Sequence, residues 1–308
     1  MSIVKSILII GNKGQVSQYL QAALKADYRV YATSRDDVDL VNTDAIQMSL
    51  KALLKQYSPA VIINPAAYTA VDLAEQEQEL TNIINAKAVA EIGQFCADVD
   101  IPVIHFSTDY VFDGNASIAY EEGDETIPNS VYGKTKLAGE QALIKSQAPA
   151  VILRTAWVYS NQGKNFYNTM LNLAETRDTL SVVHDQVGAP TYAGSIASGV
   201  KELVDVFIRQ GNIHLEQQGV YNFTCQGQTS WSGFAKRIFE SHNLKITVSD
   251  IPSSEYPTPA KRPAFSVLDG SKLKSVFGIT LPSWEVALND CVAETRSILK
   301  KPNPTSAT

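Results

Sequence analysis

Cysteine is scarce in this sequence, and the three that are present form no recognisable pattern. Cys96, Cys225 and Cys291 are far apart and odd in number. This distribution fits neither a disulfide framework nor the close spacing of zinc ligands. We therefore expect free thiols and a reducing, cytoplasmic compartment.

Long apolar runs and clusters of positive charge are also missing. The opening stretch MSIVKSILIIGNKG has an apolar run too short to cross a bilayer, has no small-residue cleavage site and leads directly into a glycine turn. The net charge is −6 and the 26 basic residues are scattered, so no basic stripe is available for a phosphate backbone. We expect neither a membrane nor a nucleic acid as a partner.

What is present is the pattern of an α/β protein. Short apolar runs rich in β-branched residues alternate with stretches of helical period; the runs are SILIIG, RVYAT, AVIIN, PVIHFST and AVILRTAW. Near-continuous apolar strands separated by helices are typical of a parallel sheet covered on both faces. The sequence therefore predicts a doubly wound, Rossmann-like fold.

The second part of the chain is less regular from about Val182, with the proline-rich segment IPSSEYPTPAKRP near its end. For a chain of 308 residues, one large domain with a smaller attached lobe is the natural expectation. We predict a mainly cofactor-binding domain over residues 1–181, a mainly substrate-binding lobe over 182–300 that is free to interleave with it, and a flexible tail over 301–308.

A glycine turn, Gly11-Asn12-Lys13-Gly14-Gln15-Val16-Ser17, follows the first predicted strand. Glycines there allow a tight turn and let a pyrophosphate approach the N-terminus of the next helix. The third small position is Ser17 instead of glycine, which still permits close packing. An ordinary strand-helix turn without a ligand is the alternative.

The residues after the second strand bear on the choice of dinucleotide. A carboxylate at this point would bind the ribose 2′-hydroxyl of NAD and repel a 2′-phosphate, but the chain has Ser34 and Arg35. This pair favours NADP(H), with NADH as the alternative cofactor. A solvated Arg35, neutralised by the neighbouring Asp36-Asp37 pair, stays open. Asp39 with Leu40 is a candidate adenine contact.

Tyr132 and Lys136 lie four residues apart in the predicted helix VYGKTKLAGEQAL, so they share one helical face. A phenol needs a nearby cation to act as a proton donor near neutral pH, and Lys136 would supply that field. The block FSTDYVFDG ends another strand, which places Thr108 at the carboxyl edge of the sheet, where ligands bind. Thr108 would orient a substrate carbonyl. A chance pair on a solvated helix is the alternative for Tyr132 and Lys136.

Taken together, these motifs resemble the extended short-chain dehydrogenases and, within them, the dTDP-4-dehydrorhamnose reductases. The resemblance covers nearly the whole chain. Its blocks are NPAAYTAVD from Asn64, STDYVFDG from Ser107, VYGKTKLAGE from Val131, RTAWVY from Arg154, DQVGAPT from Asp185, and Arg262-Pro263 with Ser266.

The resemblance implies roles for individual residues. The pyrophosphate would be held by Gly11, Gly14, Gln15 and Val16, the adenine bordered by Asp39 and Leu40, and the cofactor lined by Ala67, Tyr68 and Thr69. Thr108, Tyr132 and Lys136 would be catalytic, and Tyr132 and Lys136 would also contact the cofactor. The sugar or its nucleotide would be contacted by Val71, Thr108, Asp109, Tyr110, Trp157 and Arg262. For Trp157, core packing is the alternative, and for Arg262 it is a surface ion pair.

Two positions depart from some relatives of this family. Where those relatives carry an acid after the second strand and accept NADH, this chain has Ser34, which implies NADPH. Where some carry a glutamate in the first helix that contributes to a metal-bridged dimer, this chain has Tyr19. We therefore expect no metal and leave a homodimer open.

The resemblance implies an NADPH-dependent reductase that converts the C4 ketone of dTDP-4-dehydro-L-rhamnose to dTDP-L-rhamnose, a precursor of cell-surface polysaccharide. Another nucleotide-linked 4-keto-6-deoxy sugar is an alternative substrate, because the sequence does not show which face of the ketone meets the cofactor. A non-catalytic dinucleotide-binding subunit of the methionine adenosyltransferase type is the other alternative. Retention of Thr108, Tyr132 and Lys136 weighs against it.

Overall fold

The computed structural model describes residues 4–299, so the tail predicted for 301–308 lies outside the described residues. A six-stranded parallel sheet with the strand order β10-β5-β4-β3-β1-β2 forms its centre. The strands are β1 (Ser6–Ile9), β2 (Arg29–Ala32), β3 (Pro59–Asn64), β4 (Val103–Thr108), β5 (Ala150–Thr155) and β10 (Gly219–Asn222).

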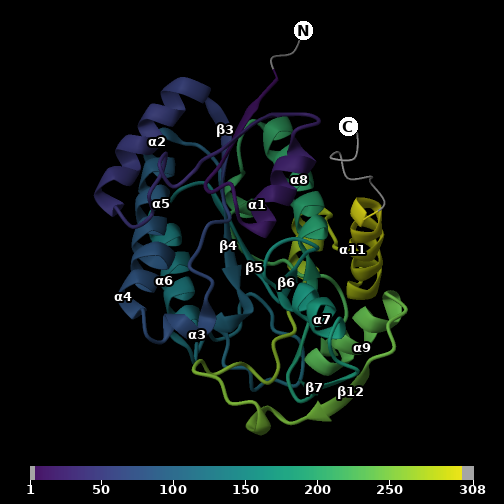
Figure 1. The fold of residues 1–308 in the computed structure, drawn as a ribbon. Helices are drawn as coiled ribbons and strands as arrows, with labels where there is room; N and C mark the ends of the chain where they lie inside the picture. The colour runs from purple at the N-terminus through teal and green to yellow at the C-terminus, as the bar shows by residue number, and fades with distance from the viewer. Residues whose placement is uncertain (1–3, 300–308) are drawn as a thin grey trace.

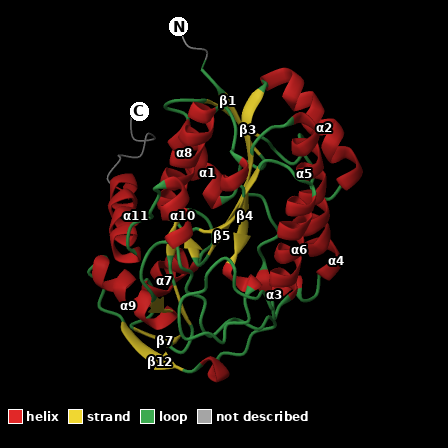
Figure 2. Ribbon diagram, turned by 180° about the vertical axis from the view of Figure 1, so that it is seen from behind, coloured by secondary structure: helices red, strands yellow, loops and turns green. Residues whose placement is uncertain are grey.

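Helices cover both faces of this sheet (Figures 1 and 2). Successive strand residues point to opposite faces, so Ile7 and Ile9 belong to one buried cluster and Leu8 and Ile10 to the other. The first cluster includes α1 (Gln15–Leu24), α8 (Ala193–Gln210) and α11 (Trp284–Leu299); the second includes α2 (Thr43–Tyr57), α5 (Ala88–Val99) and α6 (Val131–Lys145). This arrangement confirms the predicted doubly wound fold.

Short segments connect β3 to α5 and follow β4 at the carboxyl edge of the sheet. They are α3 (Val71–Ala74), α4 (Gln78–Asn82), the π-helix η1 (Ile83–Lys87) and the 3₁₀ turn η2 (Asp109–Val111). A π-helix inserts an extra residue into a helical turn and is frequent at functional sites. Residues of α3, η1 and η2 line the cavity described below.

A smaller group of elements lies beyond the same edge (Figure 1). It contains the parallel pair β7 (Thr179–Val183) and β12 (Thr247–Ile251), with α7 (Phe166–Ala174) and α9 (Trp231–Ser241). Two further short pairs are β6 (Val158–Tyr159) with β9 (Thr191–Tyr192) and β8 (Val187–Gly188) with β11 (Thr229–Ser230). The remaining short elements are η3 (Leu215–Gln217), η4 (Ser253–Glu255) and α10 (Ser271–Phe277).

The two parts of the chain interleave. β10 pairs with β5 and completes one edge of the large sheet, and α8 packs on the same face as α1. In return, α7 lies beside α9 in the smaller group (Figure 1). The domain boundary at residues 181 and 182 stays a prediction, with these exchanges running across it.

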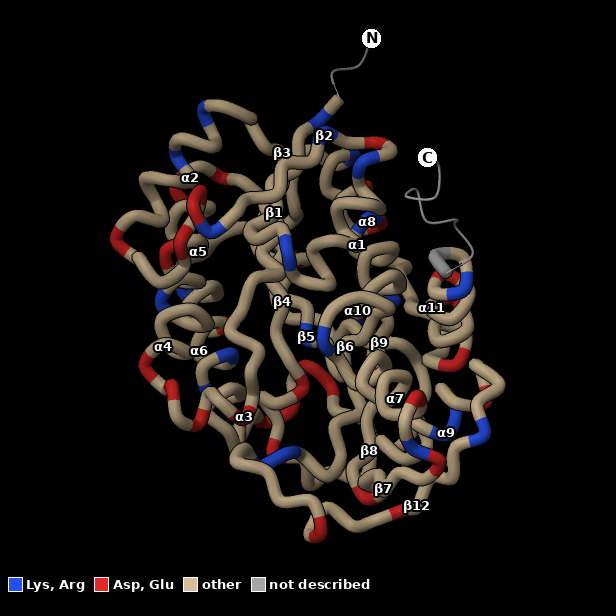
Figure 3. Tube along the Cα trace, in the orientation of Figure 1, with Lys and Arg blue, Asp and Glu red and all other residues tan. Residues whose placement is uncertain are grey.

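The cysteines are buried, and the charged residues are spread over the molecule. Cys96, Cys225 and Cys291 are buried and unpaired in the described part of the chain, and burial raises the pKa of the Cys96 thiol to about 12. Acidic and basic residues are interspersed over the visible side of the molecule (Figure 3). Among residues 4–299, no helix is both long and apolar enough to span a membrane.

Candidate active site

A cavity of about 880 Å³ opens at the carboxyl ends of the parallel strands. Its walls come from the segments that follow β1, β2, β3, β4 and β5, and from α7 and α9 of the smaller group. This is where open α/β sheets bind their ligands. A cavity of this size accommodates a dinucleotide together with part of a second molecule.

Most of the residues singled out in the sequence line this cavity. The lining includes Gly11, Gly14, Gln15, Val16, Ser34, Arg35, Asp39, Leu40, Ala67, Thr69, Val71, Thr108, Asp109, Tyr110, Tyr132, Lys136 and Trp157. Tyr68 and Arg262 are not part of it. The fold thus brings together residues that lie up to about half the chain length apart, while their individual roles stay predictions.

The two glycines of the first turn differ in what they require. Gly11 adopts a φ of +89°, which an L-residue rarely adopts, and its N–H donates to Thr33 Oγ1 at 3.0 Å. Gly14 has an ordinary φ of −65°, and a Cβ added there would meet no protein atom within 4 Å. The space beside Gly14 is therefore open cavity, as a ligand close to the backbone requires.

The N-terminus of α1 faces this space without a side-chain cap. Its free N–H groups and the helix dipole favour an anion. Ser17, the third small residue, is buried and donates its hydroxyl to the Gly11 carbonyl, so it stabilises the turn. Lys13 and Lys164 also line the cavity. The donors, the charges and the open cradle all fit a dinucleotide pyrophosphate.

The segment after β2 is held by local hydrogen bonds. The backbone N–H and the hydroxyl of Ser34 both donate to Asp37 Oδ2, at 2.7 and 2.8 Å, and hold the pKa of that carboxyl below its usual value. Arg35 is 74% exposed and pairs with Asp39 at 3.2 Å. The carboxylate that pairs with Arg35 is therefore Asp39, and not the Asp36-Asp37 pair that the sequence suggested. An exposed pair of this kind is weak, so Arg35 is free to turn toward a phosphate.

Asn85 in the π-helix η1 is a residue that the sequence reasoning missed. Its Oδ1 accepts from the Tyr68 N–H at 2.8 Å, and its Nδ2 donates to the Tyr68 carbonyl at 3.1 Å and to Thr135 Oγ1 at 3.3 Å. It thus joins the segment after β3 to α6. The Tyr68 side chain bonds to Glu77 instead of entering the cavity. Helical period alone gives no signal for a π-turn, so only the fold reveals this contact.

Thr108 and Asp109 lie at the end of β4, and both are buried. The Thr108 hydroxyl donates to Asp109 Oδ1 at 2.9 Å and accepts from the Tyr110 N–H at 3.2 Å. Burial raises the pKa of Asp109 to about 6. To donate to a bound carbonyl, the Thr108 hydroxyl has only to rotate away from Asp109.

Tyr132 and Lys136 lie one helical turn apart on α6. Tyr132 is partly accessible from the cavity, yet desolvation by the surrounding protein raises its pKa to about 12, while the Thr108 hydroxyl acts in the opposite direction. Lys136 is buried, and burial lowers its pKa to about 8. Its Nζ donates to the Phe106 carbonyl at 2.5 Å and lies 3.4 Å from His105 Nε2.

Close backbone contacts fix the position of α6. A Cβ on Gly133 would come within 2.2 Å of the Tyr110 carbonyl oxygen, and one on Gly139 within 2.2 Å of the Asn85 carbonyl oxygen. The helix also begins with Ser130, whose side chain accepts from the Gly133 N–H. Tyr132 and Lys136 are thus carried by a helix that is tightly seated against η2 and η1.

Comparison with known proteins identifies the family. Residues 5–297 match the family described as RmlD substrate binding domain. A dTDP-4-dehydrorhamnose reductase of Burkholderia thailandensis is 40% identical over 94% of this chain and 98% of its own length. The chain belongs to the dTDP-4-dehydrorhamnose reductase family.

Solved structures agree with this family membership. A dTDP-4-dehydrorhamnose reductase of Clostridium acetobutylicum is 36% identical and has a TM-score of 0.86, covering 94% of this chain and 99% of its own. The Bacillus anthracis enzyme, solved in complex with NADP, is 32% identical with a TM-score of 0.87, covering 95% of this chain and 100% of its own. The likeness extends over essentially the whole fold.

In this member of the reductase family, Trp157 is not simply packed into the core. It lines the cavity and stacks on Trp231 of α9, with ring centroids 3.5 Å apart and planes 3° apart. Its φ of +46° is unusual for a bulky residue, and a Cβ on Gly188 would come within 2.5 Å of its indole. Trp231 is a second residue that sequence reasoning missed, because it lies 74 positions further along the chain.

Arg262 makes an ion pair within this family member. It donates from both terminal nitrogens to Asp72, at 3.0 and 2.7 Å, and holds the pKa of that carboxyl below its usual value. The surface ion pair that the sequence left open is thus present. It joins the segment 253–268 to α3 at the rim, and a nucleotide contact by Arg262 stays a prediction.

Tyr19 stands where some relatives carry a glutamate, and its side chain makes hydrogen bonds within this chain. The Tyr19 hydroxyl lies 2.8 Å from both Asn161 Oδ1 and Glu294 Oε2. Within the described residues, no group of three or more His, Cys, Asp or Glu side chains is arranged to hold a metal ion. The expectation of a metal-free protein stays a prediction.

Proposed function

We propose that this chain uses NADPH to reduce the C4 ketone of dTDP-4-dehydro-L-rhamnose, forming dTDP-L-rhamnose. The observation that carries this proposal is that Thr108, Tyr132 and Lys136 line the same cavity as the glycine turn. The related enzymes named above are dTDP-4-dehydrorhamnose reductases, and one of them binds NADP. They support the same substrate and cofactor here.

The cofactor would lie along the edge of the sheet. Gly11, Gly14 and the N-terminus of α1 would hold its pyrophosphate, and Ser34 with Arg35 would contact the 2′-phosphate. Asp39 and Leu40 would border the adenine, and Ala67, Tyr68 and Thr69, in the segment after β3, would line the cofactor. When bound, NADPH supplies the hydride for the ketone carbon.

Tyr132 supplies the proton that the ketone oxygen must receive. Its raised pKa of about 12 keeps the phenol protonated at neutral pH, as a proton donor requires. A positive charge one helical turn away favours the phenolate that forms when the proton leaves. Thr108, at the end of the neighbouring strand, would orient the carbonyl so that oxygen and phenol meet.

Lys136 has a second task in this proposal. An ammonium group has three donors; one of them points to the Phe106 carbonyl, and His105 Nε2 lies 3.4 Å from the nitrogen. A remaining donor would bind the nicotinamide ribose. Lys136 would therefore hold the cofactor and supply the local positive charge at the same time.

The sugar nucleotide would occupy the remaining part of the cavity, toward the smaller group of elements. Val71, Asp109, Tyr110 and Trp157 line that part, and Arg262 lies behind the rim. We further propose a cytoplasmic location, because three buried thiols are preserved best in a reducing compartment. A homodimer stays a prediction that light scattering would test.

The decisive experiment is an assay of NADPH and NADH oxidation by the purified protein with dTDP-4-dehydro-L-rhamnose. We expect turnover with NADPH as the better cofactor and dTDP-L-rhamnose as the product. Turnover only with a different nucleotide-linked 4-keto sugar would replace the substrate and keep the reductase. Binding of NADPH without turnover of any such sugar would favour the non-catalytic alternative.

A further inference from the structure

A buried ion pair lies behind the residues to which we assign the chemistry. Arg154 of β5 donates from Nε to Glu140 Oε1 at 2.9 Å and from Nη2 to Glu140 Oε2 at 2.7 Å. The side chains are 4% and 2% exposed. Such a two-pronged pair fixes the relative position of its elements more narrowly than apolar contacts do.

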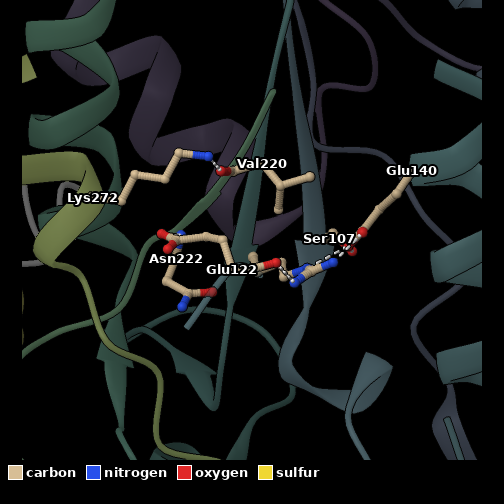
Figure 4. A network of polar contacts seen from close by, with 7 residues as sticks. Ser107, Glu122, Glu140, Val220, Asn222 and Lys272 are labelled. Atoms are coloured by element: carbon tan, nitrogen blue, oxygen red, sulfur yellow. Dashed lines mark hydrogen bonds and ion pairs between the residues drawn. The ribbon is translucent and has the colours of Figure 1, made fainter. Parts of the chain in front are cut away.

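Further contacts surround the pair (Figure 4). The Ser107 hydroxyl of β4 also donates to Glu140. Arg154 donates from Nη1 to the Glu122 carbonyl at 3.3 Å, and its guanidinium lies 5.0 Å from the centroid of the Phe112 ring. The carboxylate therefore has partners on two strands, and the guanidinium is held from several sides.

Ser107, Glu140 and Arg154 are close in sequence to proposed catalytic residues or to the cavity lining. Ser107 directly precedes Thr108, and Glu140 lies one helical turn beyond Lys136, two beyond Tyr132. Arg154 directly precedes Thr155, which lines the cavity. The network thus joins β4, which carries Thr108, to α6, which carries Tyr132 and Lys136, and both to β5. The relative position of β4 and α6 decides whether the three side chains can act on one molecule.

The charge of Glu140 also reaches Lys136. His105 on β4 lies 3.4 Å from the Lys136 Nζ, and Tyr132 and Glu140 lie on the same helix as Lys136. Arg154 on β5 pairs with Glu140, and Asp109 on η2 acts on Tyr132. Burial and the lysine both lower the pKa of His105 well below its usual value, so this imidazole is neutral. Burial also lowers the pKa of Lys136, and the Glu140 carboxylate opposes that shift. Removing the carboxylate would therefore make the ammonium easier to deprotonate.

Stability alone does not explain the pair. Two charges removed from water lose their hydration, and an apolar pair of similar volume often stabilises a protein as well or better. We propose that Glu140, held by Arg154 and Ser107, is a positioning residue that fixes the place and the positive charge of Lys136 relative to Thr108. This inference rests on the proposed reductase function.

The test compares a neutral, volume-matched pair with the wild type. In Glu140→Gln combined with Arg154→Met, neither charge is left unpaired, so we expect a folded protein. We expect kcat to fall by about tenfold or more, because small displacements of reacting groups have effects of this size. We also expect the loss of activity at high pH to move to lower pH, because Glu140 is the neighbouring charge that raises the pKa of Lys136, and NADPH to bind more weakly.

A further variant separates the effect of the position of Lys136 from the effect of its charge, and a control variant accompanies it. Arg154→Lys keeps both charges but loses the two-pronged geometry, so kcat should fall while the pH at which activity is lost stays in place. The control is Lys201→Met with Asp205→Asn and Asp27→Asn. It neutralises the ion pairs that Lys201 of α8 makes with Asp205 at 2.9 Å and with Asp27 at 3.0 Å, outside the cavity. This control should match the wild type in all three measurements.

Wild-type kcat, pH profile and NADPH affinity in the folded double variant would overturn the proposal. If the double variant does not fold, Glu140→Asp carries the test, since it keeps the charge and withdraws the carboxylate by one methylene; wild-type values there would overturn it too. NADPH affinity, followed by its fluorescence, needs no sugar substrate. A wild type that binds NADPH but reduces no dTDP-4-dehydro-L-rhamnose would contradict the proposed function, while the affinities of the variants would still decide the role of Glu140.

Discussion

The two ends of the cavity are built in different ways. At the dinucleotide end, the side chains of Ser34, Arg35 and Asp39 bond to residues two to four positions away in the sequence and are half-buried or exposed. At the chemical end, Thr108 and Lys136 are buried, and hydrogen bonds of Lys136 and its helix reach 14 to 56 positions along the chain. One end can adapt to a ligand, whereas the other is fixed before the ligand arrives.

This difference has a physical reason. A 2′-phosphate at the surface is bound by weak, interchangeable contacts, so an exposed edge with a few open donors is sufficient. Proton transfer requires one oxygen to lie within hydrogen-bond reach of one phenol. Substitutions at the chemical end should therefore reduce turnover, and substitutions at the dinucleotide end should mainly reduce affinity for the cofactor.

The largest expected effect follows the substitution Tyr132→Phe. It removes the proton donor and leaves the ring contact with Tyr110, which has centroids 5.6 Å apart. We expect kcat to fall by about 10² to 10⁴, with a much smaller loss of NADPH affinity. Steady-state NADPH oxidation and a fluorescence titration measure the two quantities. Full activity in this variant would remove Tyr132 from the mechanism.

The pH dependence of turnover tests the chemical end without a substitution. Lys136 is positive below its pKa of about 8 and neutral above it. As the pH rises through that value, the phenol loses the cation that favours its phenolate, so kcat for reduction should decrease by up to about tenfold per pH unit. A kcat that stays constant from pH 7 to pH 10 would show that the charge of Lys136 is not needed.

The two glycines of the first turn allow a matched test of the dinucleotide end. Gly14→Ala introduces no clash within the protein, so we expect unchanged stability and about tenfold weaker NADPH binding because the methyl group enters the cavity. Gly11→Ala forces alanine into a φ of +89° and should reduce the free energy of unfolding by about 1–2 kcal/mol. Urea denaturation and NADPH titration compare them. A stability loss in Gly14→Ala would break the distinction.

The smallest expected effect concerns the choice of dinucleotide. Arg35→Met should lower kcat/KM for NADPH by about fivefold to tenfold and leave that for NADH unchanged, because one charge-assisted contact to a 2′-phosphate is lost. Arg177→Met is the control, since Arg177 is exposed and outside the cavity. Equal losses with both dinucleotides would mean that Arg35 does not read the 2′-phosphate.

The contrast between the two ends also explains what could be predicted from the sequence. The fold followed from the alternation of strands and helices, and the turn at Gly11 and the spacing of Tyr132 and Lys136 follow from local geometry. All of these features have a signature within a few residues. The family resemblance then supplied candidate contacts such as Trp157 and Tyr110, which local patterns do not reveal.

Contacts between distant segments could not be predicted in this way. Asn85 has a role only because a π-turn places its amide between Tyr68 and Thr135. In the sequence, Glu140 is an acidic residue in a predicted helix and Arg154 a basic residue in a predicted strand. Only the fold shows that they are buried together as an ion pair. Arg262 was left between two interpretations, and its bond to Asp72 depends on how a proline-rich segment crosses the rim.

The place of β10 at the edge of the large sheet has a consequence for how the protein is made. β5 has one neighbour, β4, until residues 219–222 are synthesised and pair with its other side. During translation the nascent chain therefore exposes an apolar strand edge, which is a template for aggregation. The large sheet cannot be completed before more than two thirds of the chain has left the ribosome. Its last strand is therefore made after α7 and β7 of the smaller group, but before α9 and β12.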